Sequence, residues 1–371
     1  MAGPLQGLKV VELPGIGPAP LCGMLLADMG AQVLRLERPV PSGNGIARPA
    51  RFELAHRGKK MVVADLKDEK GLGLARRLIA KTDVLIEGFR PGVMERLGLG
   101  PQPCLAANPA LVYGRVTGFG QHGPLSQAAG HDLNYIALTG ALHAIGRAGQ
   151  PPVPPMNLLG DYAGGSLFLA FGIVCALLEA RRSGIGQVVD AAMIDGVSAL
   201  MTPYFGMRAA GMESGPRGTN LLDSGAPHYD VYQCQDGEYV AVAPIEPKFR
   251  QVLCERVGLD PALLAGLQDP GSWPEARAAL SRLFLTRTRD AWCRLLEGSD
   301  ACFTPVLSAQ EVAGHPHHQA REAFVAIEGV TQPAPAPRFS RTVPDMPSPP
   351  PQGAGDSAEW AAEWGLDPAE I

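Results

Sequence analysis

Short apolar runs alternate with helical patterns through the first 120 residues of the chain. Helical spacing of apolar residues follows the first run, at Leu21, Met24, Leu25 and Met29, and segments 68–81 and 92–97 are also helical in pattern. Strands that alternate with helices predict a mainly parallel sheet with helices on both faces. The first half is therefore predicted to be a doubly wound α/β domain. Its predicted strands are residues 8–13, 32–37, 61–66, 83–87 and 111–116.

Two further helices have recognisable starts. Asp132 is suited to the N-cap of one, and Asp161 precedes a long helix that runs through Leu178 and stops at Gly184. The most apolar part of this second helix, residues 163–178, is shorter than the roughly 20 residues that a membrane span needs. We therefore expect a buried core helix and no membrane span.

The pattern changes after residue 215. Residues 229–244 alternate in two arms around a turn at Asp236-Gly237, which predicts a hairpin. Helices are predicted from Pro247 to Val257 and over most of 274–299, so we expect a second, α+β domain. The segment from Pro333 to Pro351 holds eight Pro in 19 residues, which predicts an extended strap.

Composition narrows the class of protein. The chain has 371 residues and a formal net charge of −5, which argues against a nucleic-acid binder that works through bulk positive charge. Its seven Cys are scattered with no C-x-x-C pair, which is typical of reduced thiols in a cytoplasmic protein. No signal peptide is visible at the N-terminus.

Gly15, Gly17 and Pro20 follow the first predicted strand, and Glu37 ends the second. This arrangement is similar to the dinucleotide fingerprint, in which glycines approach a pyrophosphate and an acidic residue binds the ribose. Pro20 stands where that fingerprint needs Gly for close packing. A plain α/β turn is therefore favoured over an NAD site.

Cations are concentrated between Arg35 and Lys60, where seven Lys and Arg accompany two Glu. One interpretation is a solvated face, which is usual for clustered charge. The other is a site for a polyanionic small molecule held by arginine forks. Charge alone favours neither.

Three histidines lie close together at His315, His317 and His318. No Cys is near, and the neighbouring carboxylates lie outside the run, so a surface loop is favoured over a metal site. We expect no metal.

His131 and Asp161 both stand at predicted helix starts. Taken alone, each residue is typical of an N-terminal helix cap. If the fold brought the two together, free backbone N–H groups and two titratable groups would surround a cavity suited to an enolate oxygen or a thioester carbonyl. The sequence pattern by itself does not place them together.

Several motifs make the family recognisable. They are Gly130-His131-Asp132-Leu133-Asn134-Tyr135, Leu158-Leu159-Gly160-Asp161-Tyr162-Ala163-Gly164-Gly165, Gly186 to Ala191, Gly225-Ala226-Pro227 and Ile245-Glu246-Pro247. With these motifs the chain resembles, over nearly its whole length, the α-methylacyl-CoA racemases of the family III CoA-transferase (CaiB/BaiF) superfamily.

The resemblance implies the architecture. It implies a discontinuous Rossmann-like large domain, a smaller α+β domain and two subunits interlocked as a homodimer, with the Pro-rich strap travelling between domains. The expected boundaries are 1–200 and 320–371 for the large domain, 225–310 for the small one, and 201–224 and 311–351 for linkers and straps.

The resemblance also implies the ligand, a coenzyme A thioester, with no other cofactor. Arg38 would contact the adenosine end and Arg90 the nucleotide, and Ala128 to Gly130 would lie along the pantetheine near the reacting carbon. The full set of implied CoA-binding residues is Arg38, Lys59, Lys60, Met61, Val62, Asp83, Val84, Leu85, Arg90, Ser126, Gln127, Ala128, Ala129 and Gly130.

Within the resemblance, His131 distinguishes the racemase activity from the transferase activity. Transferases of the superfamily use the residue matching Asp161 as a nucleophile and usually lack this His, whereas Glu246 resembles the racemase residue that pairs with it. The implied catalytic residues are thus His131, Asp161 and Glu246, which would move the α-proton of a 2-methylacyl-CoA through an enolate. His228 and Ser224 depart from the family pattern, with consequences for the acyl pocket that the sequence leaves open.

Three alternatives stand beside the racemase. The first is a CoA-transferase that forms an aspartyl-CoA thioester at Asp161. The second is an NAD-dependent oxidoreductase built on the Gly15 and Gly17 turn. The third is a catalytically silent CoA-binding protein, which the presence of the three implied catalytic residues disfavours.

Overall fold

The computed structural model describes residues 2–40, 42–212, 215–260, 263, 266–267, 269–354 and 357–366. Its contacts divide the chain into two compact units. The first unit comprises Met1–Thr139, Met156–Leu200 and Glu322–Ile371, and the second comprises Gly140–Pro155 and Met201–Arg321. Residues 140–155, expected in the large domain, and 201–224, expected as a linker, thus group with the second unit.

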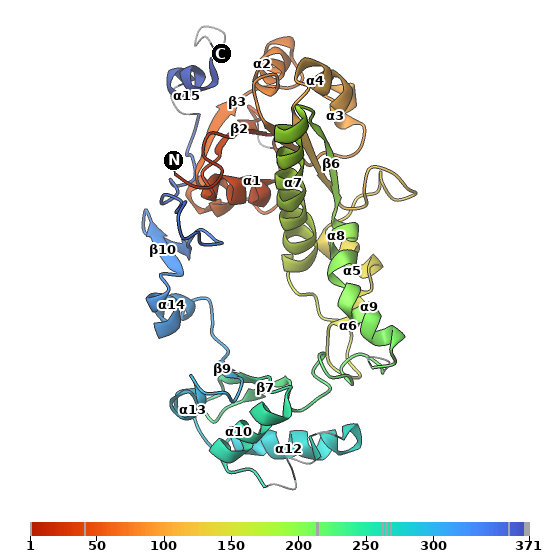
Figure 1. Cartoon of the computed structure of the whole chain (residues 1–371), viewed down its shortest axis with the longest axis vertical. Helices are drawn as coiled ribbons and strands as arrows, with labels where there is room; N and C mark the ends of the chain where they lie inside the picture. Colours follow the sequence, from red (N-terminus) through yellow and green to blue (C-terminus); the bar gives the residue numbers. More distant parts are fainter. Residues whose placement is uncertain are drawn as a thin grey trace. The chain divides into compact units, whose positions relative to one another are not determined.

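A six-stranded sheet forms the centre of the first unit (Figure 1). All neighbouring strands are parallel, in the order β3-β2-β1-β4-β5-β6, so the predicted parallel α/β sheet is confirmed. The order reverses between β1 and β4, which is where open α/β sheets bind ligands at the carboxyl ends of their strands. The strands are Lys9–Glu12 (β1), Gln32–Glu37 (β2), Lys59–Val63 (β3), Val84–Glu87 (β4), Val112–Thr117 (β5) and Gln187–Ala192 (β6).

Helices cover both faces of this sheet because strand side chains alternate between two apolar cores. On one face, Leu34 and Leu85 pack with α2 (Glu69–Ile79), α3 (Val93–Arg96), α4 (Pro101–Ala107) and α15 (Ser357–Trp364). On the other, Val33 and Val84 pack with α1 (Pro18–Asp28), α5 (Asp132–Leu138) and α7 (Phe168–Ser183). Figure 1 shows α7 running along the sheet beside β6.

The long apolar helix differs in two ways from its sequence prediction. Its first part is a π-helix, η3 (Leu158–Leu167), so Asp161 lies inside the helix rather than before it. In addition, one side of the segment is exposed. Leu158–Ser183 is long and apolar enough to span a membrane by length and composition, and 44% of its most apolar window is buried inside the protein. One side of the segment therefore packs in the core and the other side is exposed.

The remaining elements of the first unit lie around these layers. Residues after β11 form the predicted strap, which has no helix or strand up to residue 354 and whose Ser348 carbonyl accepts the Gly58 amide. The elements are η1 (Ala50–Phe52), η2 (Leu54–His56), α8 (Met193–Leu200) and the hairpin of β10 (Phe324–Ile327) and β11 (Val330–Pro333).

The second unit is built on a three-stranded antiparallel sheet, β7-β8-β9. Its hairpin of β7 (Asp230–Gln233) and β8 (Tyr239–Val242) is the one predicted from the alternating pattern, and α10 spans the predicted Pro247–Val257. Phe284 and Trp292 centre its apolar core. The other elements are α6 (Ala141–Ala144), α9 (Thr202–Ala209), η4 (Pro270–Ser272), α12 (Trp273–Phe284), α13 (Arg289–Leu296), β9 (Phe303–Pro305), η5 (Val312–Gly314) and α14 (Pro316–Ala320).

Candidate active site

Asp161 is held by hydrogen bonds to its backbone and to its side chain. Its backbone N–H donates to Asp132 Oδ1 at 2.6 Å, and Asn157, at the N-cap of η3, donates from Nδ2 to Asp161 Oδ2 at 3.1 Å. Asp132 begins α5, so the first of these bonds ties the start of α5 to the π-helix. The carboxyl group of Asp161 is thereby fixed at a junction of two helices.

The turn after β1 closes this junction from the other side. Gly17 has a positive φ of 66°, and a Cβ at this position would lie 3.1 Å from Asp161 Oδ2. The Ser166 hydroxyl lies 2.8 Å from the Pro18 carbonyl oxygen and 3.1 Å from that of Asp161, and it donates between them. The Gly15–Pro18 turn, considered above for a nucleotide, thus lies against the carboxyl group of Asp161.

Burial changes the acidity of Asp161. Removal of the carboxyl from water raises its pKa above the usual range. The Asn157 hydrogen bond opposes this rise in pKa, the negative charge of Asp132 adds to it, and His131 opposes it. A carboxyl group with a raised pKa keeps its proton to higher pH than an ordinary carboxyl group, which suits it to act as an acid as well as a base.

His131 is the N-cap residue of α5 and is exposed. Its backbone N–H donates to Asn134 Oδ1 at 3.1 Å, which closes the first turn of the helix. Because His131 precedes Asp132, the bond between Asp132 and Asp161 brings the segment of the histidine next to the buried carboxyl group. The structure therefore joins two residues that are 30 positions apart in the sequence.

Glu246 belongs to the second unit. It is exposed at the N-cap of α10, beside Pro247. The pairing of Glu246 with His131 stays a prediction.

Several predicted CoA-binding residues gather at the carboxyl edge of the sheet. Arg38 follows β2, and its guanidinium carbon lies 5.7 Å from the ring centroid of Phe89, which follows β4. Arg90, the next residue in the chain, is exposed. Gln127, in the loop between β5 and α5, donates from Nε2 to the Pro91 carbonyl oxygen at 3.1 Å. The loops after three strands, including residues 126–130, therefore lie at one edge.

Lys59 requires a correction. Its side chain is fully buried, and Nζ donates to Glu12 Oε2 at 2.5 Å and to the Pro20 carbonyl oxygen at 2.7 Å. Burial lowers the pKa of Lys59 and raises that of Glu12, and their attraction opposes both shifts in pKa. The charge of Lys59 is paired with buried Glu12 and is therefore not available to bind a phosphate. Lys60, by contrast, is exposed and pairs with Glu363 at 2.9 Å.

The segment 83–85 also requires a correction. Val84 and Leu85 are fully buried in opposite cores of the sheet. Asp83 lies at the amino end of β4, where its Oδ2 accepts the Lys9 amide at 2.8 Å. Their side chains thus lie in the cores or at the amino end of the strand, and Val62 is likewise buried in the sheet, next to half-buried Met61.

Two further segments follow strands at the carboxyl edge and lie largely outside the predicted set of CoA-binding residues. They are residues 64–67, which follow β3, and residues 88–90, of which only Arg90 was predicted. The signal that could have found them is the end of each predicted strand, since ligands of open parallel sheets lie beyond the strand carboxyl ends.

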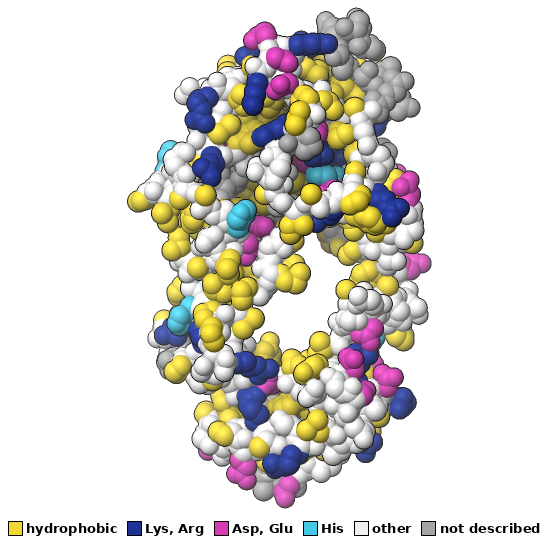
Figure 2. All heavy atoms as spheres, turned by 180° about the vertical axis from the view of Figure 1, so that it is seen from behind, with side chains coloured by type: hydrophobic (Ala, Val, Ile, Leu, Met, Phe, Trp, Pro, Cys, Tyr) yellow, Lys and Arg dark blue, Asp and Glu magenta, His cyan; other side chains and the backbone are white. Residues whose placement is uncertain are grey.

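The basic segment 35–60 is not a basic surface. Arg57 is buried and pairs with Asp28 at 2.6 Å, Arg48 pairs with Glu53, and Arg35 contacts Glu37. On the face that Figure 2 shows, the described Lys and Arg side chains of the first unit stand among apolar and uncharged ones and form no single patch. Of the seven cations in this segment, Arg57, Lys59 and Lys60 pair with carboxylates outside it, namely Asp28, Glu12 and Glu363.

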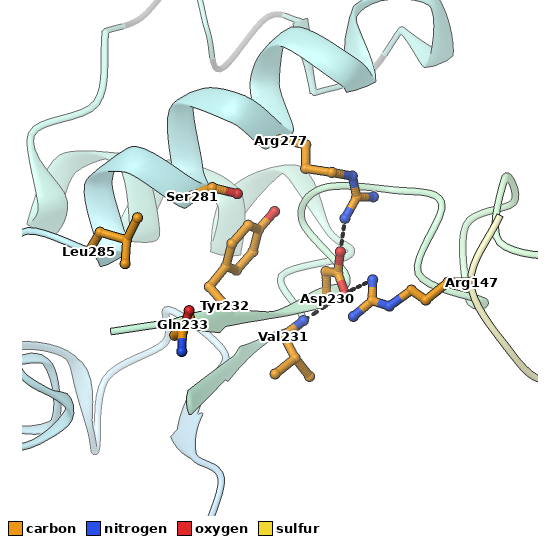
Figure 3. Close-up of a pocket in the computed structure, with 8 residues that line it drawn as sticks. All are labelled: Arg147, Asp230, Val231, Tyr232, Gln233, Arg277, Ser281 and Leu285. Carbon is orange, nitrogen blue, oxygen red and sulfur yellow. Dashed lines mark hydrogen bonds and ion pairs between the residues drawn. The ribbon is translucent and has the colours of Figure 1, made fainter. Parts of the chain in front are cut away.

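A separate pocket of about 320 Å³ lies within the second unit (Figure 3). The buried carboxylate of Asp230 pairs there with Arg147 at 2.5 Å and with Arg277. None of the predicted site residues lines it. The two arginines are engaged by Asp230, so we assign this pocket no ligand.

The histidine run lies near Glu297. His315 Nε2 lies 2.8 Å from Glu297 Oε1, and the run sits at the start of α14. In the part of the chain that the structure describes, no group of three or more His, Cys, Asp or Glu is placed to hold a metal ion.

A parallel α/β sheet, with a half-buried carboxyl group beside a histidine near its carboxyl edge, defines the class of this protein. The chain belongs to CoA-transferase family III, whose model matches residues 5–356. Within the family it is 43% identical over 370 residues to the alpha-methylacyl-CoA racemase of Mus musculus, covering 99% of this chain and 95% of that protein. It is also 43% identical over 347 residues to the alpha-methylacyl-CoA racemase of Homo sapiens, covering 93% and 88%.

More distant relatives carry other activities in their names. The acetyl-CoA:oxalate CoA-transferase of Acetobacter aceti is 30% identical over 381 residues, covering 97% of this chain and 96% of that one. Among solved structures, a CaiB/BaiF family protein from Brucella suis has a TM-score of 0.81 at 28% identity, covering 98% and 100%. The identity to the racemases is thus higher than to this transferase, over a similar length.

Proposed function

We propose that the chain epimerises the α-carbon of 2-methyl-branched acyl-CoA thioesters. The observation that carries the proposal is the junction of α5 with η3, which sets His131 beside a half-buried Asp161 of raised pKa. The 43% identity to proteins named alpha-methylacyl-CoA racemase supports the same activity.

The reaction requires proton transfer on both faces of one carbon. For one enantiomer, an imidazole nitrogen of His131 removes the α-proton, and the electron pair of the broken C–H bond moves to the thioester oxygen as an enolate. The carboxyl group of Asp161 then gives its proton to the opposite face of the carbon as the enolate collapses. For the other enantiomer, Asp161 is the base and the protonated His131 is the acid.

The surroundings of the two groups suit these roles. The imidazole of His131 has two ring nitrogens and can accept or donate a proton through them. The raised pKa of Asp161 increases the fraction of enzyme that carries its proton. The first turn of α5 has amide N–H groups without intrahelical acceptors, which are suited to a developing enolate oxygen.

The CoA part of the substrate is proposed to bind along the carboxyl edge of the sheet. Arg38 with the Phe89 ring supports an adenosine site, because a guanidinium and an aromatic face both stack on bases and arginine also binds phosphates. Ser126 to Gly130 lead from this edge to His131, which suits the pantetheine arm. No cofactor beyond the CoA of the substrate is proposed.

We further propose a homodimer with a Rossmann-like large domain. The strand order β3-β2-β1-β4-β5-β6 is that of nucleotide-binding doubly wound sheets. Leu167, Phe171 and Leu178 recur at helical spacing along one side of η3 and α7 and are 53%, 69% and 64% exposed. Such an apolar stripe is suited to burial against a second copy.

A cytoplasmic location is also proposed. All seven Cys are free thiols in the structure, as expected of a protein kept in a reducing compartment.

The proposed activity can be tested by α-proton exchange. Pure enantiomers of 2-methylacyl-CoA thioesters are incubated with the protein in deuterium oxide, and deuterium at C2 and inversion are followed by mass spectrometry and chiral analysis. We expect both from the wild-type chain. In H131A we expect at least a 100-fold loss of inversion, and of deuterium exchange from the enantiomer for which His131 is the base, because the base on that face is removed.

The control for this test is H122A, which removes an exposed histidine of the loop before α5 that has no proposed role. Inversion in H131A at the wild-type rate would contradict the assignment of His131.

A second activity is favoured by one observation, the 30% identity to an acetyl-CoA:oxalate CoA-transferase. In that reaction Asp161 would be the nucleophile and would carry CoA as a thioester. Hydroxylamine or borohydride added during turnover would then modify Asp161, as peptide mass spectrometry can detect. Modified Asp161 would favour the transferase, and unmodified Asp161 with α-deuterium incorporation favours the racemase.

A further inference from the structure

The side chain of Asp132 is buried next to the proposed catalytic pair, but the mechanism above gives it no role. Asp132 is 5% exposed. Its Oδ1 accepts the backbone N–H of Asp161 at 2.6 Å. Its Oδ2 is also buried and has no hydrogen-bond partner within the described part of the chain. Buried carboxylates ordinarily bind several donors or a cation, so this orphaned oxygen requires an explanation.

The groups around Asp132 provide no matching positive charge. On α5 its neighbours are His131 and Tyr135, and on η3 it faces Asp161. Among the described residues, no Lys or Arg forms an ion pair with Asp132. The positive charge of Arg90 acts instead on the Tyr135 hydroxyl, where it opposes the rise in pKa that burial causes. The carboxylate is therefore kept beside a second carboxyl group without a cation to balance it.

The backbone is shaped to admit this contact. A Cβ on Gly160 would lie 2.6 Å from Asp132 Oδ1, closer than a Cβ atom approaches its non-bonded neighbours in proteins. Gly160 thus lets the Asp132 carboxylate reach the amide of the next residue, Asp161. A carboxylate that only capped a helix at the protein surface would not need a glycine to admit this close approach.

We propose that Asp132 is a positioning residue for the proposed reaction: one oxygen fixes Asp161 next to His131, and the other keeps an unbalanced negative charge beside the Asp161 carboxyl group. This inference rests on the proposed function for its catalytic meaning. Its physical content, a charge acting on Asp161, concerns the resting protein and can be tested without substrate.

The consequence for proton transfer follows from the sign of the charge. A neighbouring negative charge disfavours the ionised form of Asp161 and so adds to the rise in its pKa that burial causes. More of the enzyme then carries the proton that Asp161 must donate when His131 is the base. Without the charge, Asp161 would ionise at lower pH.

The test measures at which pH Asp161 loses its proton. A water-soluble carbodiimide with an amine reacts with protonated carboxyl groups, and peptide mass spectrometry quantifies the label at Asp161 across pH 3 to 8. D132N keeps an oxygen that can accept the Asp161 amide but removes the charge. We expect its labelling midpoint to lie about 0.5 to 1 pH unit below that of the wild type.

A matched control is D68N. Asp68 accepts the Gly71 amide at 2.6 Å at the start of α2, so it makes the same kind of bond in the first unit without facing Asp161. D68N should leave the midpoint at Asp161 unchanged. A folded D132N with the wild-type midpoint would overturn the proposal.

D132S removes the charge with a smaller side chain and replaces D132N if the latter does not fold, as judged by circular dichroism. If neither variant folds, Asp132 is a structural residue and the proposal is overturned.

A kinetic measurement separates this inference from the proposed function. In α-deuterium exchange, D132N should lower kcat about tenfold and leave KM within about twofold, because Asp132 orients Asp161 without contacting CoA. If the wild-type chain exchanges no α-proton, the proposed function is wrong, and the labelling midpoints still decide whether Asp132 acts on Asp161.

Discussion

Lys59 and Lys60 are neighbours in the chain, yet their ammonium groups have opposite surroundings. Lys59 is buried against Glu12, whereas Lys60 is exposed and pairs with exposed Glu363. A buried ion pair that loses one partner leaves an uncompensated charge, which costs about 3–5 kcal/mol, whereas an exposed pair contributes about 0–1 kcal/mol. Two residues of the same type and similar predicted role therefore differ in what they stabilise.

K59M should lower the free energy of unfolding by about 3–5 kcal/mol, because Glu12 would remain buried without its partner. K60M is the matched control and should change it by less than about 1 kcal/mol. Urea unfolding followed by circular dichroism measures both. Equal stabilities of the two variants would show that the Lys59–Glu12 pair does not matter for folding.

His228 is a second residue whose burial determines its role. It is 2% exposed, and neither ring nitrogen has a hydrogen-bond partner among the described residues. Burial, with Arg250 nearby, lowers the pKa of His228 to about 4. The folded protein thus holds a neutral imidazole that the unfolded chain would protonate below about pH 6.5.

Between about pH 6.5 and 4 the unfolded state binds more protons at this position, so His228 makes stability fall as pH falls through that window. H228F removes both the unpaired nitrogens and the titration. We expect H228F to have a higher Tm than the wild type at pH 7. The gain of H228F over the wild type in free energy of unfolding should be larger at pH 5, by more than about 1 kcal/mol. Thermal unfolding at the two pH values measures this, and a difference independent of pH would contradict the assignment.

At the scale of elements, the π-helix η3 determines where the Asp161 carboxyl group points. Gly164 allows this: a Cβ there would lie 2.6 Å from Val197 of α8. The buried Ser166 hydroxyl then bonds η3 to the first turn of α1. π-helical segments are uncommon and often occur at functional sites, which agrees with the position of Asp161 in η3.

S166A should loosen this junction, because the buried Pro18 carbonyl oxygen loses its donor. We expect a loss of about 1–2 kcal/mol in stability and a lower kcat for α-exchange at nearly unchanged KM. S198A is the control, since Ser198 donates to Ile194 at 2.7 Å on an exposed face of α8. Unchanged kcat in S166A would show that η3 keeps its geometry without this bond.

At the scale of the whole molecule, the exposed side of α7 is the feature that the single chain leaves unexplained. The opposite side, with Leu169, Ile173 and Leu177, packs on the sheet, so the helix already has its place in the fold. An apolar stripe on the remaining side is costly in water. A second copy of the chain is the partner we propose.

F171D should convert the expected dimer into monomers, because a carboxylate would be buried in an apolar interface. F171L keeps the side chain apolar and should remain dimeric. Size-exclusion chromatography with light scattering at micromolar protein measures both masses. A wild-type chain that is monomeric, or an F171D variant that stays dimeric, would contradict the proposed interface.

Much of the architecture could be predicted from local patterns. The periods of apolar residues placed β2 and α10 at their observed bounds and β1, β3, β4 and β5 within a few residues, because burial on a sheet face or helix stripe is repeated along the chain itself. The strands β6, β9, β10 and β11 were not predicted. The motifs around His131 and Asp161 likewise indicated the family that the comparisons confirm. These features depend on neighbours in the sequence.

Partners distant in sequence were decided only by the tertiary structure. Lys59 looked like a surface cation until Glu12, 47 positions away, was placed beside it in the interior. Asp83 to Leu85 looked like ligand contacts until the parallel sheet put them at its amino end and in its cores. The close approach of Asp132 to Asp161 depends on two helices meeting at Gly160. Charge and hydrogen-bond partners are set by the packing of distant segments, so residue type alone does not determine them.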